Sequence, residues 1–120
     1  MLTGDLEETG EREILEREQK HGGKEWPPYG FAVLKAGHHG SRTSGSEAWL
    51  EAVKPRLTLI SCGKDNSYGH PHKEALERLE AAGSKILQTT ECGAIIVESN
   101  GKNFQVHAFR KILLTIFQNQ

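Results

Sequence analysis

Three polar segments of this sequence carry side chains that are suited to metal binding and hydrolysis. Each segment contains glycine and follows a short predicted strand. Their candidate residues are Asp5 in the first segment, His38, His39 and Ser41 in the second, and Asn66, Tyr68 and His70 in the third. Imidazole and carboxylate groups are common ligands of zinc, manganese and iron. Ligand sites in open α/β sheets lie beyond the carboxyl ends of the strands. If the strands are parallel, we therefore expect Asp5, one histidine of the pair and His70 to share one cleft.

The adjacent histidines His38 and His39 need a special backbone to act together. On a regular strand their side chains would point to opposite sides. In a loop flanked by Gly37 and Gly40, both imidazoles can face the same cleft. We expect one of them to be a metal ligand and the other to contact the substrate or to support the ligand. A surface loop with two solvated histidines is the alternative that the residue types alone leave open.

Other signatures of catalysis are absent or incomplete. The sequence contains no G-x-S-x-G elbow and no P-loop. The segment that starts at His70 does not complete an H-x-H-x-D-H metal motif, because Glu74 and Ala75 stand where aspartate and histidine are needed. We therefore expect His72 to be solvated on the surface of a helix. Ser44 is explained as a helix cap rather than as a nucleophile.

Composition places the chain among ordinary globular domains. It has 120 residues, a formal net charge of −1, and 26% charged and 36% hydrophobic residues. This length suits one domain, and the balanced charge does not favour broad non-specific binding to nucleic acid. No window of 18 apolar residues is present, so we expect no direct insertion of this segment into a membrane. Cys62 and Cys92 both lie beside apolar, strand-like residues, which favours two buried thiols over a disulfide.

The order of predicted elements is typical of an α/β fold. Short apolar runs predict buried strands at 31–34, 57–62 and 86–87, and Asn100-Gly101 predicts a hairpin between 94–97 and 104–107. Helical spacing predicts helices at 11–20, after the capping box Ser44-Gly45-Ser46-Glu47, and from His70 with Pro71 in its first turn. The first three residues read as the end of a strand, so we expect a fragment. The tail at 108–120 is a possible helix with one apolar stripe, made of Ile112, Leu113, Ile116 and Phe117.

Several motifs, taken in order, resemble one protein family. They are Leu2-Thr3-Gly4-Asp5-Leu6-Glu7, the run Val33–Ser41 with Ser44, the pair Ile60-Ser61, the segment Tyr68-Gly69-His70-Pro71-His72 with Asn66, and Thr89-Thr90 followed by Gly93-Ala94-Ile95. Together they resemble the carboxy-terminal metallo-β-lactamase-like domain of the ComEC family of competence DNA-uptake proteins. The resemblance runs from residue 2 to about residue 97.

The resemblance implies that the chain is part of a larger fold. That fold is an αββα sandwich, of which this α/β chain would be the C-terminal half, with one mixed sheet and helices mainly on one face. Residues 1–107 would form the partial metallo-β-lactamase-like domain, and residues 108–120 would form the tail. The family's H-x-H-x-D-H motif lies upstream and is absent here. The resemblance implies two divalent metal ions per complete site, manganese or zinc, and an incomplete site in this chain.

The resemblance also implies a role for each candidate residue. Asp5 and His39 would be metal ligands, and His38 and His70 would be catalytic groups near the substrate phosphate. An alternative assignment makes His70 the ligand in place of His39. The remaining candidates would bind the substrate, and they are Ser41, Asn66 and Tyr68.

These roles imply a nuclease-like phosphodiesterase of DNA uptake that is inactive as the isolated chain. The alternative is a non-enzymatic, phosphate-binding or structural remnant of that domain. The implied partners are DNA and the missing N-terminal half of the domain. The parent protein would lie in the cell membrane with this domain soluble. A sheet face left uncovered by the missing half would favour a homo-oligomer, unless the tail helix covers it.

Overall fold

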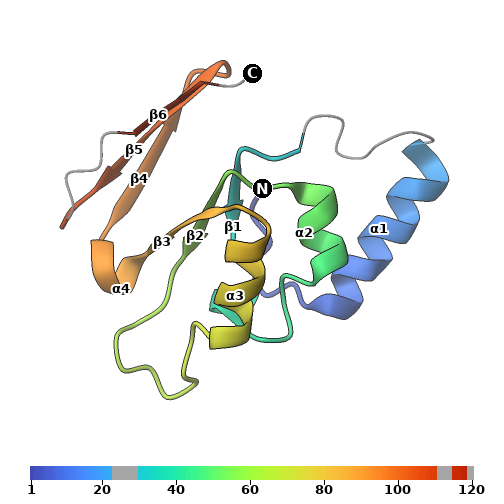
Figure 1. The fold of residues 1–120 in the computed structure, drawn as a ribbon, viewed down its shortest axis with the longest axis horizontal. Coiled ribbons are helices and arrows are strands. Elements are labelled where there is room, and N and C mark those ends of the chain that lie inside the picture. Colours follow the sequence, from blue (N-terminus) through green and yellow to red (C-terminus); the bar gives the residue numbers. More distant parts are fainter. Residues whose placement is uncertain (23–29, 111–114, 119–120) are drawn as a thin grey trace.

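A three-stranded parallel sheet lies at the centre of the computed structural model, which describes residues 1–22, 30–110 and 115–118. Its strands are β1 (Val33–Lys35), β2 (Leu57–Ile60) and β3 (Lys85–Gln88), in the order β1-β2-β3 (Figure 1). Residues 1–3 run along the outer edge of β1, where Leu2 forms a parallel bridge with Lys35. Thr3 fixes this edge, because its hydroxyl donates to the Lys35 carbonyl at 2.7 Å. The carboxyl ends of all these segments therefore lie at one edge of the sheet.

Helices cover one face of the parallel sheet. They are α1 (Glu8–Gly22), α2 (Glu47–Val53) and α3 (Lys73–Ala81), which lie together on one side of the strands in Figure 1. Side chains that alternate along the strands point to this side and form a core with the helices. The buried members of this core are Leu34, Ala36, Trp49, Leu50, Val53, Ile60 and Leu79. Partly buried side chains of α1 and α3, among them Ile14, Leu15 and Leu76, pack against this core.

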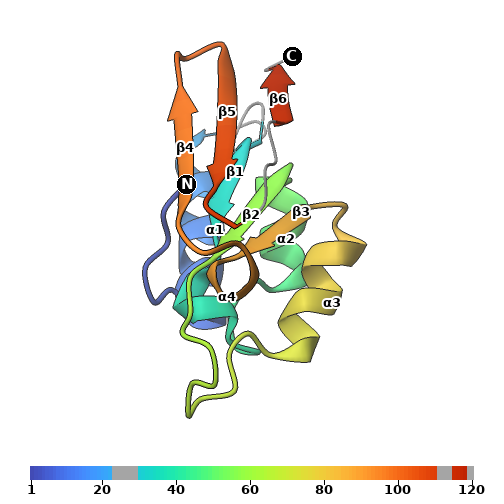
Figure 2. The ribbon, with the colours of Figure 1, turned by 90° about the vertical axis from the view of Figure 1, so that its left-hand side faces the viewer.

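A second sheet covers the opposite face. It is antiparallel and contains β4 (Ile95–Ser99), β5 (Asn103–Ala108) and β6 (Thr115–Gln118), and Figure 2 shows it beside the parallel sheet. The short helix α4 (Thr89–Cys92) and Gly93, with a φ of 68°, separate β3 from β4. Leu57 and Leu87 of the parallel sheet share a buried cluster with Phe104 and Val106 of β5. The described chain is thus layered as helices, parallel sheet and antiparallel sheet.

The second sheet corrects three expectations. The strands form two separate sheets rather than one mixed sheet, because the turn at α4 carries the chain over the face of β3 instead of along its edge. The sheet face expected to be uncovered is covered by β4 and β5, which removes that argument for a homo-oligomer. The tail is not helical where it is described, since β6 pairs with β5 and contains Ile116 and Phe117. Ile112 and Leu113 lie outside the described residues.

Two helix starts also differ from the sequence prediction. Helix α3 begins at Lys73 with His72 as its N-cap residue, so His70 and Pro71 belong to the preceding loop. Helix α2 is capped by Ser46, whose hydroxyl accepts the Trp49 N–H at 3.3 Å. Ser44 is not the cap, because its hydroxyl instead lies 2.7 Å from the Gly37 carbonyl. Contacts within the preceding loops therefore hold His70, Pro71 and Ser44 outside the two helices.

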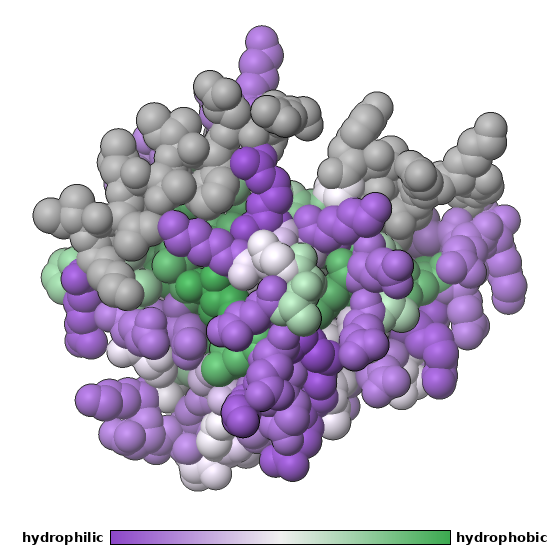
Figure 3. All heavy atoms as spheres, viewed as in Figure 1, coloured by the Kyte–Doolittle hydropathy of each residue, from purple (hydrophilic) through white to green (hydrophobic). Residues whose placement is uncertain are grey.

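Polar side chains lie mainly at the surface, and apolar side chains form the core. Figure 3 shows hydrophilic side chains over most of one face, with apolar side chains gathered toward its middle. Cys62 and Cys92 are free thiols, as predicted, but only Cys92 is buried, whereas Cys62 is partly exposed. None of the helices among the described residues combines the length and the hydrophobicity needed to cross a bilayer.

Candidate functional site

The candidate site lies where the first residues and the loop after β1 meet. The loop Gly37–Gly40 forms a short 3₁₀ turn, and the His38 N–H donates to the Gly4 carbonyl at 2.9 Å. Glycine is needed at both ends of this turn. A Cβ on Gly37 would lie 2.5 Å from the Leu6 carbonyl oxygen, and one on Gly40 would lie 2.8 Å from Pro71 Cβ. The glycines therefore let three segments that are distant in sequence approach closely.

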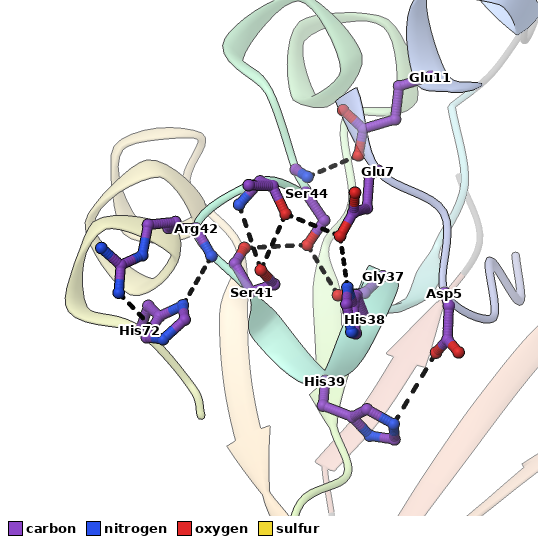
Figure 4. Close-up of polar contacts among 12 residues, drawn as sticks. Asp5, Glu7, Glu11, Gly37, His38, His39, Ser41, Arg42, Ser44 and His72 are labelled. Atoms are coloured by element: carbon purple, nitrogen blue, oxygen red, sulfur yellow. Dashed lines mark hydrogen bonds and ion pairs between the residues drawn. The ribbon is translucent and has the colours of Figure 1, made fainter. Parts of the chain in front are cut away.

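Asp5 and His39 face each other across this junction. His39 Nε2 lies 3.9 Å from Asp5 Oδ1, and the contact is drawn in Figure 4. His39 Nδ1 lies 2.6 Å from the Ser61 carbonyl oxygen, which can only accept a hydrogen bond. Nδ1 therefore carries a hydrogen, and in the neutral ring the lone pair is on Nε2, toward Asp5. Both side chains are accessible, with 48% of His39 and 76% of Asp5 exposed.

Both histidines of the pair have left-handed backbone conformations. The φ angles are 43° for His38 and 56° for His39. This conformation is uncommon for residues other than glycine. It breaks the alternation of an extended chain and brings the two rings to within 6.4 Å of each other, measured between centroids. The left-handed backbone therefore accounts for the proximity of the two rings.

Glu7 orients His38 and was not predicted as a site residue. His38 Nδ1 lies 2.6 Å from Glu7 Oε1, and the Thr43 hydroxyl donates to the same oxygen at 3.0 Å. These hydrogen bonds hold the pKa of Glu7 below its usual value, and the bond from His38 has the larger effect. A carboxylate at this position keeps the hydrogen on Nδ1 when the ring is neutral, so Nε2 is the atom free for proton exchange.

His70 lies among the other imidazoles. Its ring centroid is 5.5 Å from that of His38, 6.3 Å from that of His39 and 4.7 Å from that of His72. Burial lowers the pKa of His70, and the nearby positive charge of His72, His38, His39 and Arg42 lowers it further. The lowered pKa favours the neutral ring, whose lone pair can accept a proton or bind a cation. The structure thus brings together all the histidines that the sequence assigned to the site.

Ser41 and Asn66 have internal partners. Ser41 is only 5% exposed, and its hydroxyl lies 2.9 Å from the Thr43 hydroxyl. The Asn66 amide donates to the Gly63 and His70 carbonyls at 2.9 and 2.7 Å, and its oxygen accepts the His70 N–H at 2.9 Å. Ser41 is buried, and both hydrogens of the Asn66 amide nitrogen are used within the protein. Their positions favour support of the two loops over direct substrate binding.

His72 is held between loops, and the expectation that it is solvated on a helix surface is wrong. Its Nδ1 accepts the Arg42 N–H at 2.9 Å, and its Nε2 lies 3.0 Å from the Tyr68 carbonyl oxygen. Nε2 therefore carries the hydrogen, and the ring ties the loop after β1 to the loop after β2. No local pattern in the sequence signals this contact, because Arg42 and His72 are 30 residues apart.

Replacing Asn66 should loosen the loop that carries His70. In the Asn66→Ala variant, the His70 N–H loses its acceptor, so we expect its hydrogen exchange to be about tenfold faster, as for the loss of one hydrogen bond. Exchange measured by NMR tests this expectation. Asn100→Ala is the matched control, because Asn100 accepts two backbone N–H groups in the hairpin turn and has no contact with this loop. Equal exchange of the His70 N–H in the two variants would contradict the supporting role of Asn66.

The donor set of the site fits part of a metal centre. Asp5 offers an exposed carboxylate, and His39 offers an Nε2 lone pair oriented by the Ser61 carbonyl. Such a second hydrogen bond is what metal-binding histidines usually have. Within the described ranges, no group of three or more histidine, cysteine, aspartate or glutamate side chains is arranged to hold a metal ion. At the Asp5–His39 contact, the described residues therefore offer two groups of the types that bind metals, fewer than a closed metal site requires.

Comparison with known proteins finds similarity to segments of several curated bacterial proteins. The chain is 38% identical over 95 residues to ComE operon protein 3 of Bacillus subtilis. It is 39% identical over 95 residues to competence protein ComA of Neisseria gonorrhoeae, and 38% identical over 97 residues to recombination protein 2 of Haemophilus influenzae. No protein-family model and no solved structure matches the chain.

These similarities cover most of the chain but little of each relative. They cover 79%, 79% and 81% of this chain, whereas the chain spans only 11%, 13% and 11% of the lengths of these relatives. One of these relatives is named a competence protein and another a recombination protein. The chain is therefore similar, over most of its length, to short segments of much longer proteins.

Proposed function

We propose that this chain is part of a metal-dependent phosphodiester hydrolase that acts on DNA during natural competence. The proposed fold of the complete domain is the αββα sandwich of the metallo-β-lactamase type, to which the chain contributes its C-terminal half. The single observation that carries the proposal is the contact between Asp5 and an oriented His39 at the carboxyl edge of a parallel sheet. Imidazole and carboxylate ligands suit manganese and zinc.

In this proposal, Asp5 and His39 hold a divalent cation. When bound, such a cation supplies an activated water and neutralises the negative charge that develops on the phosphate. His38 would exchange a proton with the substrate at Nε2, because Glu7 holds the hydrogen of Nδ1. His70, which is neutral more readily than an ordinary histidine, would contact the phosphate or take the place of His39 as ligand.

The remaining ligands would come from outside these 120 residues. The proposal assigns them to a segment that carries an H-x-H-x-D-H motif, which this sequence lacks. The proposed role in DNA uptake is drawn from the relatives, of which one is named a competence protein and another a ComE operon protein. The proposed partners are therefore DNA and the other half of the domain, in a parent protein of the cell membrane.

A non-enzymatic remnant that binds phosphate without metal is the second candidate. It is favoured by the lack of a three-ligand group among the described residues. In such a protein the loops would still be ordered, because Glu7, His72 and Asn66 hold them through protein contacts alone. Metal titration separates the two candidates.

Calorimetric titration of Mn²⁺ or Zn²⁺ into the chain tests the proposed function. We expect weak binding that Asp5→Ala and His39→Ala each reduce at least about tenfold, because each removes one ligand of an already incomplete set. Asp65→Ala and His107→Ala are matched controls, since they remove the same chemical groups elsewhere, and they should leave the affinity unchanged. If none of the four substitutions alters metal affinity while phosphate binding persists, the remnant is the better description.

A further inference from the structure

Tyr68 places a large aromatic ring at the surface of the candidate site. The residue is 75% exposed. A single exposed aromatic residue is ordinary and needs no explanation. Tyr68 differs because its ring is stacked on the imidazole of His70, with centroids 5.6 Å apart and an interplanar angle of 18°. The ring is therefore presented in a defined orientation.

The loop that carries Tyr68 is held from several sides. His72 Nε2 lies 3.0 Å from the Tyr68 carbonyl oxygen, and the Gly69 N–H donates to the Asn66 carbonyl at 3.2 Å. The Asn66 side chain closes the same loop onto His70 through both its amide and its oxygen. A ligand that contacts the Tyr68 ring therefore needs to order little of the protein, which favours binding.

Tyr68 extends a row of rings outward from the candidate metal ligands. The His70 ring lies 6.3 Å from His39 and is also nearly parallel to it, at an interplanar angle of 20°. Tyr68 follows on the solvent side of this row. A phosphate held near the histidines would thus have a flat, aromatic surface beside it. Among the groups attached to a nucleic-acid phosphate, the nucleobase has the matching shape.

Stacking on Tyr68 requires a nucleobase with a free face. Bases in a duplex are covered by their neighbours, and exposing one costs a few kcal/mol. Unpaired bases offer their faces at lower cost, and stacking on an aromatic side chain tolerates every base. Stacking on Tyr68 would therefore distinguish single-stranded from double-stranded nucleic acid, but it would not distinguish one base sequence from another.

We infer that Tyr68 is a stacking platform for an unpaired nucleobase next to the bound phosphate, and that it gives the site a preference for single-stranded over duplex substrate. The identity of the substrate as a nucleic acid rests on the proposed function. The stacking role itself rests on the exposure, the orientation and the support of the Tyr68 ring.

Binding without catalysis tests the inference. Fluorescence anisotropy would measure binding of the 120-residue chain, in EDTA and low salt, to three labelled probes of equal length. The probes are single-stranded oligothymidylate, the same backbone with abasic sites, and a blunt duplex. We compare the native chain with Tyr68→Leu and Tyr68→Phe, and with Phe109→Leu, which removes another exposed aromatic ring.

We expect the native chain to bind oligothymidylate about tenfold more tightly than the abasic probe or the duplex. Tyr68→Leu should abolish this difference, whereas Tyr68→Phe and Phe109→Leu should preserve it to within about twofold. The inference is overturned if the native chain does not distinguish the probes, if it binds none of them, or if Phe109→Leu has the same effect as Tyr68→Leu. Because EDTA removes metal, these outcomes are independent of the titration that tests Asp5 and His39.

Discussion

Mixed with Mn²⁺ or Zn²⁺, the isolated chain is expected to cleave no phosphodiester bond faster than the metal alone. The reason is the number of ligands, since in the proposed site Asp5 and His39 would supply only two. Affinity and geometry at a metal site both depend on the complete set of ligands. Supplying the segment with the H-x-H-x-D-H motif, in a longer form of the protein, should restore turnover. We expect the gain over the isolated chain to be on the order of 10⁶ or more, as for enzymes in general.

A nuclease assay with a fluorescent DNA substrate measures this difference. The essential control is Asp5→Ala, prepared in parallel in both the isolated chain and the longer form. In the longer form, the substitution should remove the restored activity, whereas Asp65→Ala should not. Turnover by the isolated chain that disappears in its Asp5→Ala variant would refute the half-site, because it would show that these 120 residues are sufficient.

The second large effect is expected from Glu11, a buried carboxylate behind the site. Glu11 is 1% exposed, although it is a glutamate on the first helix. Its oxygens accept the N–H groups of Gly45 and Ser46 at 2.5 and 2.9 Å. Alanine at this position leaves both buried donors without that acceptor, at a cost of about 1–3 kcal/mol each. We therefore expect Glu11→Ala to lower the free energy of unfolding by roughly 3 kcal/mol.

Urea denaturation followed by circular dichroism measures the effect. Glu13→Ala is the matched control, because Glu13 is exposed on the same helix, and it should change the free energy of unfolding by less than about 0.5 kcal/mol. Glu11→Gln should fall between the two, since one oxygen remains to accept a hydrogen bond. A loss in Glu11→Ala no larger than in Glu13→Ala would show that these two hydrogen bonds add no stability.

The same contact ties the fold to the candidate site. Gly45 and Ser46 follow directly after Ser44, whose hydroxyl reaches the Gly37 carbonyl at the base of the histidine turn. Glu11 therefore fixes the far end of the segment that presents His38 and His39, as Figure 4 shows. Loss of Glu11 should disturb the site as well as the global stability.

The central strands and the hairpin could be predicted because their signals are local. The apolar run at 57–62 contains β2, and Asn100-Gly101 marks the turn between β4 and β5. The tail could not be predicted in this way. The spacing of Ile116 and Phe117 fits a helix stripe, but pairing of β6 with the edge of β5 decides the structure there. Tertiary context commonly overrides such short patterns.

The sequence predicted which loops come together at the candidate site, but it predicted only some of the side chains that interact there. Asp5, His39 and His70 follow strand ends, so the rule that parallel strands share a carboxyl edge was enough to bring them together. Glu7 and His72 were missed as site residues, because their partners lie 31 and 30 residues away in the sequence. Residues that orient a ligand are recognised only when the loops that they join have known positions.

The left-handed turn at His38 and His39 has a consequence for engineering this domain. Each non-glycine residue in that region of the Ramachandran map carries a conformational penalty of order 1–3 kcal/mol. Glycine would relieve the penalty, so variants selected only for heat resistance should drift toward glycine at these positions and lose the imidazoles. At these two positions, selection for thermostability therefore acts against selection for the proposed function of the imidazoles.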